Sequence, residues 1–394
     1  MQALSGSPVA GRMPLTMTRR LVEIDTLPAF DTHLRRTRRL TGWFVQSLDL
    51  SDRAEALLAP DPAGAVFLGC TFAAGVEEQL RRRGALVFPR LPDLPFDPYR
   101  PCLYDAGTLY GTGGYPASPD AAIYAWSKAE RPPSLSHTLA ATLHDHAVTD
   151  ALDDATASLD PRRVVGVMGG HALQRGEPGF ADAAELGGSL TRSGRTVLTG
   201  GGPGAMEAAN LGAYLSPWPD ALDAALDLLA DRPTYRDDLD GWVAAARGVR
   251  ERWPAAQAGR SLSIPTWFYG HEPTNLFATG IAKFFANALR EDTLLHRCRG
   301  GIVYLPGQAG TVQEIFQAVT ENFYAADESD VAPMVLVGRT YWTTTYPAWP
   351  LLLRLGEGRP LGQVVFCVDT VAEASALLVG PGAVPRTGRG ITPG

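Results

Sequence analysis

Short apolar runs alternate with amphipathic stretches along the second half of the chain. The runs have the length of buried strands, and the stretches between them repeat apolar residues at the three- and four-residue spacing of helices. Strands are expected at residues 163–168, 196–199, 262–268, 301–305, 333–337 and 364–368. Helices are expected at residues 181–193, 205–214, 274–297, 311–324, 341–355 and 371–378. This alternation predicts a doubly wound, Rossmann-like α/β fold, in which helices cover both faces of a parallel sheet.

The first half of the chain has a weaker pattern. Apolar runs at 65–69 and 85–89 flank an amphipathic stretch at 73–83, which predicts a β–α–β unit. Residues 1–60 have little regular pattern, and a long helix is expected at 134–159.

The helix at 134–159 ends at a break, Asp160-Pro161, where we place the domain boundary. We expect a smaller α/β domain over residues 1–160 and the doubly wound domain over 161–382. A largely helical insertion is expected at 215–260 within the second domain, and a loose tail at 383–394.

Composition narrows the class of protein. With 394 residues, of which 45% are hydrophobic, the chain is long enough for two domains that each bury a core. The net charge of −7 gives no reason to expect binding to nucleic acid or to an anionic membrane. The longest apolar stretch is too short to span a membrane, and the start has no apolar core of a secretory signal, so we expect a cytoplasmic protein. The four cysteines, Cys70, Cys102, Cys298 and Cys367, lie far apart and form no CxxC pair. They therefore indicate neither a metal site nor a disulfide framework.

The first candidate site is a glycine-rich turn between a predicted strand and a predicted helix. Its glycines let backbone N–H groups approach an anion, and the following helix adds partial positive charge at its N-terminus. The alternative is a tight turn that needs glycine only for its backbone angles. The glycines of this turn are Gly200, Gly201, Gly202 and Gly204.

A second glycine-rich turn, Pro306 to Gly310, also follows a predicted strand and opens a predicted helix. Two such turns in one parallel sheet lie at its carboxyl edge, where open α/β sheets bind ligands. The pair predicts a site for phosphate or a nucleotide, with Gly307 and Gly310 near the anion and the Thr311 hydroxyl on a phosphate oxygen. The alternative is that Thr311 and Glu314 form a capping box at an ordinary helix start.

Other candidates have less support from the pattern alone. Arg290 lies on a predicted helix, where it serves either as a fixed cation for a negative charge or as an ion-pair partner on the surface. Gly170 and His171 follow the first strand of the second domain and border either a ligand or a simple turn. His144 and His146 do not share a face of a helix, so they make a poor metal pair, and we expect no metal and no cofactor.

Taken together, the two turns and Arg290 resemble the LOG family, whose members cleave nucleoside 5′-monophosphates into free base and ribose 5-phosphate. The family motif PGGxGTxxE is similar to residues 306–314 here, and the family's upstream GGG turn is similar to residues 200–202. The surrounding sequence is most similar to the longer bacterial members, the pyrimidine/purine nucleotide 5′-monophosphate nucleosidases. The resemblance covers residues 164–378, apart from the insertion, and does not extend over 1–150.

The resemblance implies a role for each matching residue. Glu314 corresponds to the catalytic glutamate and Arg290 to the catalytic arginine, while Gly201, Gly202, Gly307, Gly310 and Thr311 correspond to the phosphate and ribose cradle. Gln308 departs from the motif, because the family has its second glycine there. A carboxylate beside the anomeric carbon suits this reaction, since N-glycosidic cleavage passes through a cation-like ribosyl group. The aromatic residues Trp267, Phe268 and Tyr269 are candidates for stacking on the base, with the hydrophobic core as their alternative place.

Two other functions remain open. The chain is either an enzyme or a non-catalytic nucleotide-binding protein on the same fold, for which Gln308 is the favourable feature. An interaction protein is the third reading, with arginine runs at 35–39 and 81–83 for an anionic effector. Pyridoxal-dependent lysine decarboxylation is disfavoured, because the only lysines are Lys128 and Lys283 and neither follows a phosphate loop. We expect a homodimer or a higher homo-oligomer.

Overall fold

The computed structural model describes residues 22–270, 272–325 and 330–379. The contacts between Cα atoms divide the chain into two compact units, of which the first ends at Pro92 and the second begins at Asp93. The tail expected at 383–394 lies outside the described residues.

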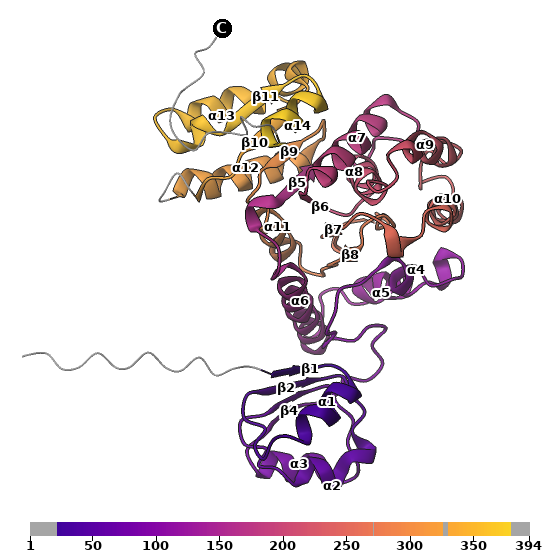
Figure 1. Cartoon of the computed structure of the whole chain (residues 1–394), viewed down its shortest axis with the longest axis vertical. Helices are drawn as coiled ribbons and strands as arrows, with labels where there is room; N and C mark the ends of the chain where they lie inside the picture. Colours follow the sequence, from indigo (N-terminus) through magenta and orange to yellow (C-terminus); the bar gives the residue numbers. More distant parts are fainter. Residues whose placement is uncertain (1–21, 271, 326–329, 380–394) are drawn as a thin grey trace, which may run out of the picture. The chain divides into compact units, whose positions relative to one another are not determined.

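The first unit contains a four-stranded sheet in its described part, with the strands in sequence order and all parallel (Figure 1). The strands at 65–69 and 85–89 and the helix at 73–83 are confirmed, as β3, β4 and α3. Residues 22–46, where little pattern was found, add β1, α1 and β2, because their short strands gain order only by pairing side by side. The elements are β1 (Val22–Ile24), α1 (Leu27–Leu34), β2 (Trp43–Gln46), a 3₁₀ turn (Ser51–Arg53), α2 (Ala54–Leu58), β3 (Val66–Leu68), α3 (Val76–Arg82) and β4 (Leu86–Phe88).

The second unit is built on a parallel sheet of seven strands among the described residues, in the order β11-β10-β9-β5-β6-β7-β8. Successive strands from β5 to β8 extend the sheet in one direction, and β9 to β11 extend it from the other side of β5 (Figure 1). The order therefore reverses between β5 and β9. The strands are β5 (Val164–Met168), β6 (Thr196–Thr199), β7 (Ser261–Ser263), β8 (Gly280–Ile281), β9 (Ile302–Tyr304), β10 (Met334–Val337) and β11 (Val365–Val368).

Helices flank this sheet in two groups, as the doubly wound prediction requires: α7, α8 and α14 pack together, and α11, α12 and α13 form the other group. The insertion at 215–260 is largely helical, as expected. The helices that follow the strands are α7 (Pro178–Arg192), α8 (Ala205–Tyr214), α9 (Leu222–Ala230), α10 (Leu239–Arg252), α11 (Asn287–His296), α12 (Ala309–Tyr324), α13 (Ala348–Gly356) and α14 (Val371–Val379). Shorter turns lie at Pro161–Arg163, Pro219–Ala221, Ala255–Gln257, Tyr341–Thr345 and Pro360–Gln363, of which Tyr341–Thr345 is π-helical.

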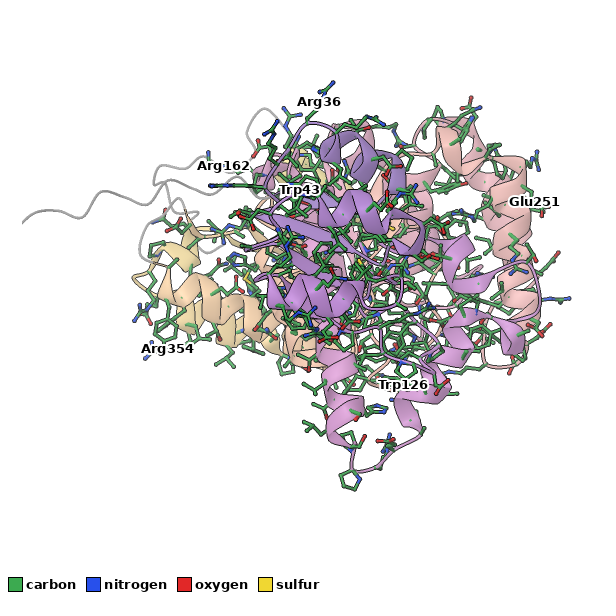
Figure 2. The ribbon with its side chains drawn as sticks, turned by 90° about the horizontal axis from the view of Figure 1, so that it is seen from below. Arg36, Trp43, Trp126, Arg162, Glu251 and Arg354 are labelled. Atoms are coloured by element: carbon green, nitrogen blue, oxygen red, sulfur yellow. The ribbon has the colours of Figure 1, made fainter. Side chains whose placement is uncertain are left out.

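Three further helices precede this sheet in the chain and belong to the same unit: α4 (Ala106–Tyr110), α5 (Pro119–Lys128), with a 3₁₀ turn (Tyr115–Ala117) before it, and α6 (Leu135–Thr156). Trp126 of α5, which is labelled in Figure 2, stacks on His137 of α6, with ring centroids 3.8 Å apart. Asp120 of α5 forms a buried ion pair with Lys283, at 2.6 Å between Oδ1 and Nζ. Asp145 of α6 accepts hydrogen bonds from two backbone N–H groups just before α11. The unit therefore begins well before residue 160, where the Asp160-Pro161 break had placed the boundary.

The helix predicted at 274–297 is wrong over its first half. Only Gly280–Ile281 pair with β7, as β8, the residues around them up to Ala286 are non-helical, and α11 begins at Asn287. The buried Asn275 side chain hydrogen bonds to Gly202 O in the turn after β6 and to Asn210 of α8, and Thr279 N–H donates to Ser261 O, so these partners replace the helical ones. The strand expected at 262–268 is correspondingly short, since β7 ends at Ser263.

Candidate active site

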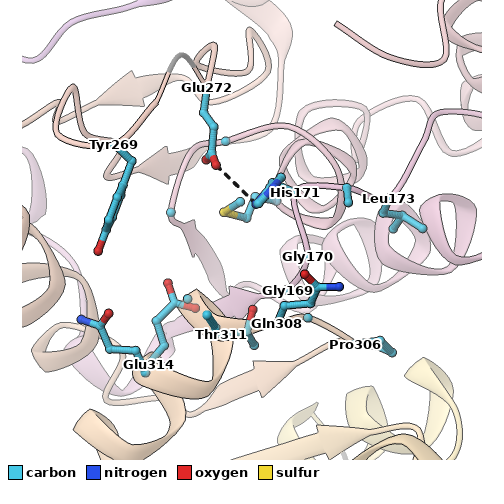
Figure 3. Close-up of a pocket in the computed structure, with 18 of the residues that line it drawn as sticks. Gly169, Gly170, His171, Leu173, Tyr269, Glu272, Pro306, Gln308, Thr311 and Glu314 are labelled. Carbon is cyan, nitrogen blue, oxygen red and sulfur yellow. Dashed lines mark ion pairs between the residues drawn. The ribbon is translucent and has the colours of Figure 1, made fainter. Parts of the chain in front are cut away.

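A cavity of about 570 Å³ lies at the carboxyl ends of β5, β6 and β9. These strands flank the point where the strand order reverses, which is the usual ligand site of an open α/β sheet. Both glycine-rich turns line the cavity, together with the loop that follows β5 (Figure 3). The structure thus brings the two turns together, as the sequence predicted.

The turn after β6 is shaped by steric limits. Gly201 has φ of 76°, which L residues rarely adopt, and a Cβ there would lie 2.8 Å from the Pro265 ring. Both the backbone angle and the lack of space therefore require glycine. A Cβ on Gly200 would collide with the guanidinium of Arg290, and one on Gly204 would collide with the carbonyl oxygen of Gly170. Packing therefore explains part of the glycine pattern, which is what the tight-turn alternative predicted. The same turn also lines the cavity, so the two interpretations are compatible.

Three buried polar side chains hold this turn in place, and none of them belongs to the motifs predicted from the sequence. The Thr199 hydroxyl accepts from Gly201 N–H at 3.0 Å and donates to Asn210 Oδ1 at 2.7 Å. The amide of Asn275 donates to Gly202 O at 3.2 Å and to Asn210 Oδ1 at 3.0 Å. The available signal was an asparagine directly before apolar residues in each of two segments, Asn210 and Asn275; both are fully buried, and buried polar groups need partners.

The second turn leads directly into α12, which begins at Ala309 rather than at Thr311. Gln308 occupies the N-cap position, and its side chain makes no capping bond. Thr311 is therefore inside the first turn, and the capping-box alternative for Thr311 and Glu314 is wrong. The first backbone N–H groups of a helix have no partner within the helix, and those of α12 begin beside the cavity.

The turns also fix one another. Gly170 N–H donates to Pro306 O at 3.0 Å, and Ala205 N–H donates to Gly170 O at 3.1 Å. A Cβ on Gly307 would collide with the Thr311 hydroxyl, so the second turn closes tightly on the start of α12. Tyr341, which belongs to none of the predicted motifs, donates its hydroxyl to Gly307 O at 2.8 Å. Three separate loops thus form one rim around the N-terminal ends of α8 and α12.

Arg290 is held by backbone atoms from two strand ends. Its Nε donates to Ile264 O at 2.7 Å, and its Nη2 donates to Gly200 O at 3.2 Å. Its Nη1 lies 2.6 Å from Glu291 Oε1 and 3.6 Å from Glu314 Oε1. The Arg290 side chain is only 9% exposed, and it lines the cavity. Arg290 is thus a fixed buried cation rather than a surface ion-pair partner.

Glu314 lies in the second turn of α12, and its carboxyl group points into the cavity on the side where Tyr269 lies (Figure 3). Burial raises its pKa to about 8, against the opposing attraction of Arg290, and the nearby Glu291 carboxylate raises it further. A group with this pKa exchanges protons near neutral pH, which is the property of a general acid or base.

Of the remaining residues that the sequence proposed for the site, some line the cavity and others are buried in the core. Gly202, Gly310 and His171 line the cavity, and His171 Nδ1 lies 3.4 Å from Glu272 Oε1. Of the three aromatic candidates, Tyr269 is on the cavity wall, whereas Trp267 is buried in the core and hydrogen bonds to Asp120. The exposed Gln308 side chain lines the cavity.

No group of three or more His, Cys, Asp or Glu side chains in the described ranges is placed to hold a metal ion. His144, a candidate only in sequence, is buried and hydrogen bonds through Nε2 to the Tyr104 hydroxyl at 2.8 Å. Within the same ranges, every helix is too short or too polar to cross a membrane.

No protein-family profile and no curated protein matches the sequence. Solved structures with some similarity include the molybdenum cofactor carrier protein of Chlamydomonas reinhardtii, at 18% identity and a TM-score of 0.33, over 54% of this chain and 93% of that chain. The molybdenum cofactor binding protein of the phototrophic bacterium Rippkaea orientalis has 17% identity and a TM-score of 0.32, with coverage of 54% and 93%. Similarity at this level carries no argument about what this chain binds.

Proposed function

We propose that this chain hydrolyses the N-glycosidic bond of nucleoside 5′-monophosphates and releases free base and ribose 5-phosphate. One observation carries the proposal: a buried Glu314 and a backbone-anchored Arg290 meet, 3.6 Å apart, in a cavity whose rim carries two glycine-rich turns. The resemblance of residues 200–202, 290 and 306–314 to the LOG family gives the same assignment.

The rim suits the 5′-phosphate. The N-terminal ends of α8 and α12 both begin at it, and helix N-termini favour anions through their free N–H groups and their dipole. A Cβ on Gly310 would meet nothing within 4 Å, so the protein itself does not require glycine there. A phosphate in close contact with the backbone would require it.

The wall beyond the rim suits the glycosidic bond. A carboxyl group with a pKa of about 8 holds a proton at neutral pH, and a departing base needs one. Arg290 adds a cation whose direction is set by Ile264 O and Gly200 O. Binding energy from the phosphate then orients the sugar against these groups, so that a part of the substrate that does not react supports the part that does.

A panel of nucleotides tests the proposal. The full chain is incubated with AMP, GMP, IMP, CMP, UMP, dAMP and N6-isopentenyl AMP, and free base and ribose 5-phosphate are quantified. Release of base from any member supports the function and gives the base preference. Glu314→Gln should lower the rate by about 10²–10⁴-fold, because it removes the proton that the carboxyl group exchanges.

Glu321→Gln is the matched control, since Glu321 lies on the same helix but outside the cavity lining. If no base is released while nucleotides still raise the melting temperature, the chain is a nucleotide-binding protein without this activity. Gln308, which lines the cavity at the motif's second glycine position, would then be the first residue to replace with glycine.

A further inference from the structure

Glu291 is a second buried carboxylate in the cavity, and neither the motif nor the proposed reaction uses it. It is 3% exposed, and it lies on α11 next to Arg290. Its Oε1 lies 2.6 Å from Arg290 Nη1, whereas Glu314 Oε1 lies 3.6 Å from the same nitrogen. Two carboxyl groups thus compete for one side of one guanidinium.

The other contacts of Arg290 prevent it from turning toward Glu314. Its Nε and Nη2 are bonded to backbone carbonyl oxygens, which leaves Nη1 as the nitrogen shared by the two carboxyl groups. Glu291 Oε1 also accepts from the Asn287 amide at 3.5 Å, and its Oε2 has no hydrogen-bond partner among the described residues. Glu291 therefore directs its charge mainly at Arg290.

We propose that Glu291 is a positioning residue that pairs with Arg290 and so leaves Glu314 to enter the reaction as a protonated acid. This inference rests on the proposed function and assigns the two glutamates different tasks in it. Glu291 keeps the charge that balances the arginine, and Glu314 carries the proton that moves.

The proton balance of the step closes without any other reagent. The bond between C1′ and the base nitrogen breaks, its electron pair goes to the base, and the Glu314 proton is transferred to the base. Water then forms the new bond at C1′ and gives a proton to the Glu314 carboxylate. The enzyme returns to its starting state, with one base and one ribose 5-phosphate released per water consumed.

The other groups around Glu314 leave Arg290 and Glu291 as the charges that matter. Tyr304 of β9 and Cys298 after α11 are fully buried, and burial raises the pKa of each, so both are neutral in the relevant range. The other titratable groups that line the cavity do not hydrogen bond to Glu314 in the described structure; they are His171, Glu177, Tyr269, Glu272 and Tyr341.

The test is the pH dependence of nucleotide hydrolysis by the full chain and by Glu291→Gln. In the variant, the whole charge of Arg290 becomes available to Glu314, so the loss of activity with rising pH should move to lower pH by about one unit or more. Near pH 8 a shift of about one unit should make the variant about fivefold slower than the wild type, the difference should approach about tenfold at higher pH, and the two should converge at low pH. An unchanged profile would overturn the inference.

Two further variants separate charge from packing. Glu291→Asp keeps the carboxylate and should restore the wild-type profile in large part, which a structural role for the longer side chain would not do. Glu251→Gln is the matched control, because Glu251 is exposed on α10 and lies outside the cavity lining (Figure 2). It should leave the profile unchanged.

A titration that needs no turnover keeps the two proposals apart. Protein labelled with ¹³C at the glutamate carboxyl groups is titrated by NMR, and the Glu314 signal is assigned by its absence in Glu314→Gln. The Glu314 titration should move to lower pH in Glu291→Gln, whether or not nucleotides are cleaved. If it does not move, the inference fails; if it moves but no base is ever released, the proposed function fails instead.

Discussion

Glu314 shows at the scale of one residue how burial and charge oppose each other. Arg290 lowers the pKa of this carboxyl group, but burial raises it by more, and the result is about 8. An arginine 3.6 Å away is therefore insufficient to keep the carboxylate ionised at neutral pH when a second carboxylate lies closer to the same arginine. Holding this carboxyl group in its protonated form costs the fold stability at neutral pH.

That cost gives a prediction about pH and stability. The folded chain holds the Glu314 proton between pH 4.5 and about 8, whereas the unfolded chain releases it, so folding stability from this group falls as the pH rises through that window. Glu314→Gln lacks the effect. Its free energy of unfolding relative to wild type should rise by up to roughly 5 kcal/mol from the acid to the alkaline end of the window.

Urea unfolding at pH 5 and pH 8 measures this difference, with Glu251→Gln as the control that should show none. A gap between Glu314→Gln and wild type that is the same at both pH values would mean that Glu314 titrates normally. The assignment of Glu314 as a proton donor would then have to be withdrawn.

At the scale of elements, the first turn of α12 gives the sharpest test of ligand contact. Gly310 is helical and faces open space, so Gly310→Ala should leave the fold intact and even stabilise it by about 0.5–1 kcal/mol. If a phosphate lies against this turn, the added methyl group should weaken nucleotide binding by tenfold or more, on the order of 1–3 kcal/mol. Isothermal titration calorimetry measures both the affinity and its change.

Gly248→Ala is the matched control, because Gly248 lies on α10, is exposed, and has nothing within 4 Å of an added Cβ. It should gain similar stability and leave nucleotide affinity unchanged. Equal affinities in the wild type and both variants would show that the ligand does not approach the backbone at Gly310.

The sequence predicted the elements whose pattern is local and missed those that depend on distant partners. Both glycine-rich turns, their strands and α12 follow from short apolar runs and glycine spacing. The non-helical segment before α11 does not, because Asn275 finds its partners far away in the chain, on the turn after β6 and on α8. For the same reason the pairing of Glu291 with Arg290 could be guessed from adjacency, but its competition with Glu314 could not.

At the scale of the whole molecule, the second unit depends on helices that precede its sheet. Tyr110 of α4 donates its hydroxyl to Thr274 O at 2.5 Å, and Asp120 of α5 balances the buried Lys283. Asp145 of α6 satisfies the backbone N–H groups of Phe285 and Ala286. The pattern along the chain could not reveal these contacts, so the Asp160-Pro161 break was the best available boundary.

Two truncated chains test this dependence. A chain lacking residues 1–92 retains every residue of the cavity and all these partners, so it should keep its melting transition and its nucleotide response. A chain lacking residues 1–160 leaves Lys283 as an unpaired buried charge, which alone costs about 3–5 kcal/mol. Circular dichroism during heating should show this second chain unfolded or melting far lower; equal melting of both chains would contradict the assignment.

The anchoring of Arg290 by Ile264 O and Gly200 O has a consequence for how this protein can evolve. Backbone carbonyl oxygens persist whatever side chain a position carries, so the place of the cation survives mutation around it. Tyr269, Glu272 and His171 line the same cavity, and among the described residues none of them forms a hydrogen bond or an ion pair with Arg290. Substitutions at these positions can therefore change what the cavity recognises without moving the Arg290 guanidinium, so the recognition of a ligand and the position of the cation can evolve separately.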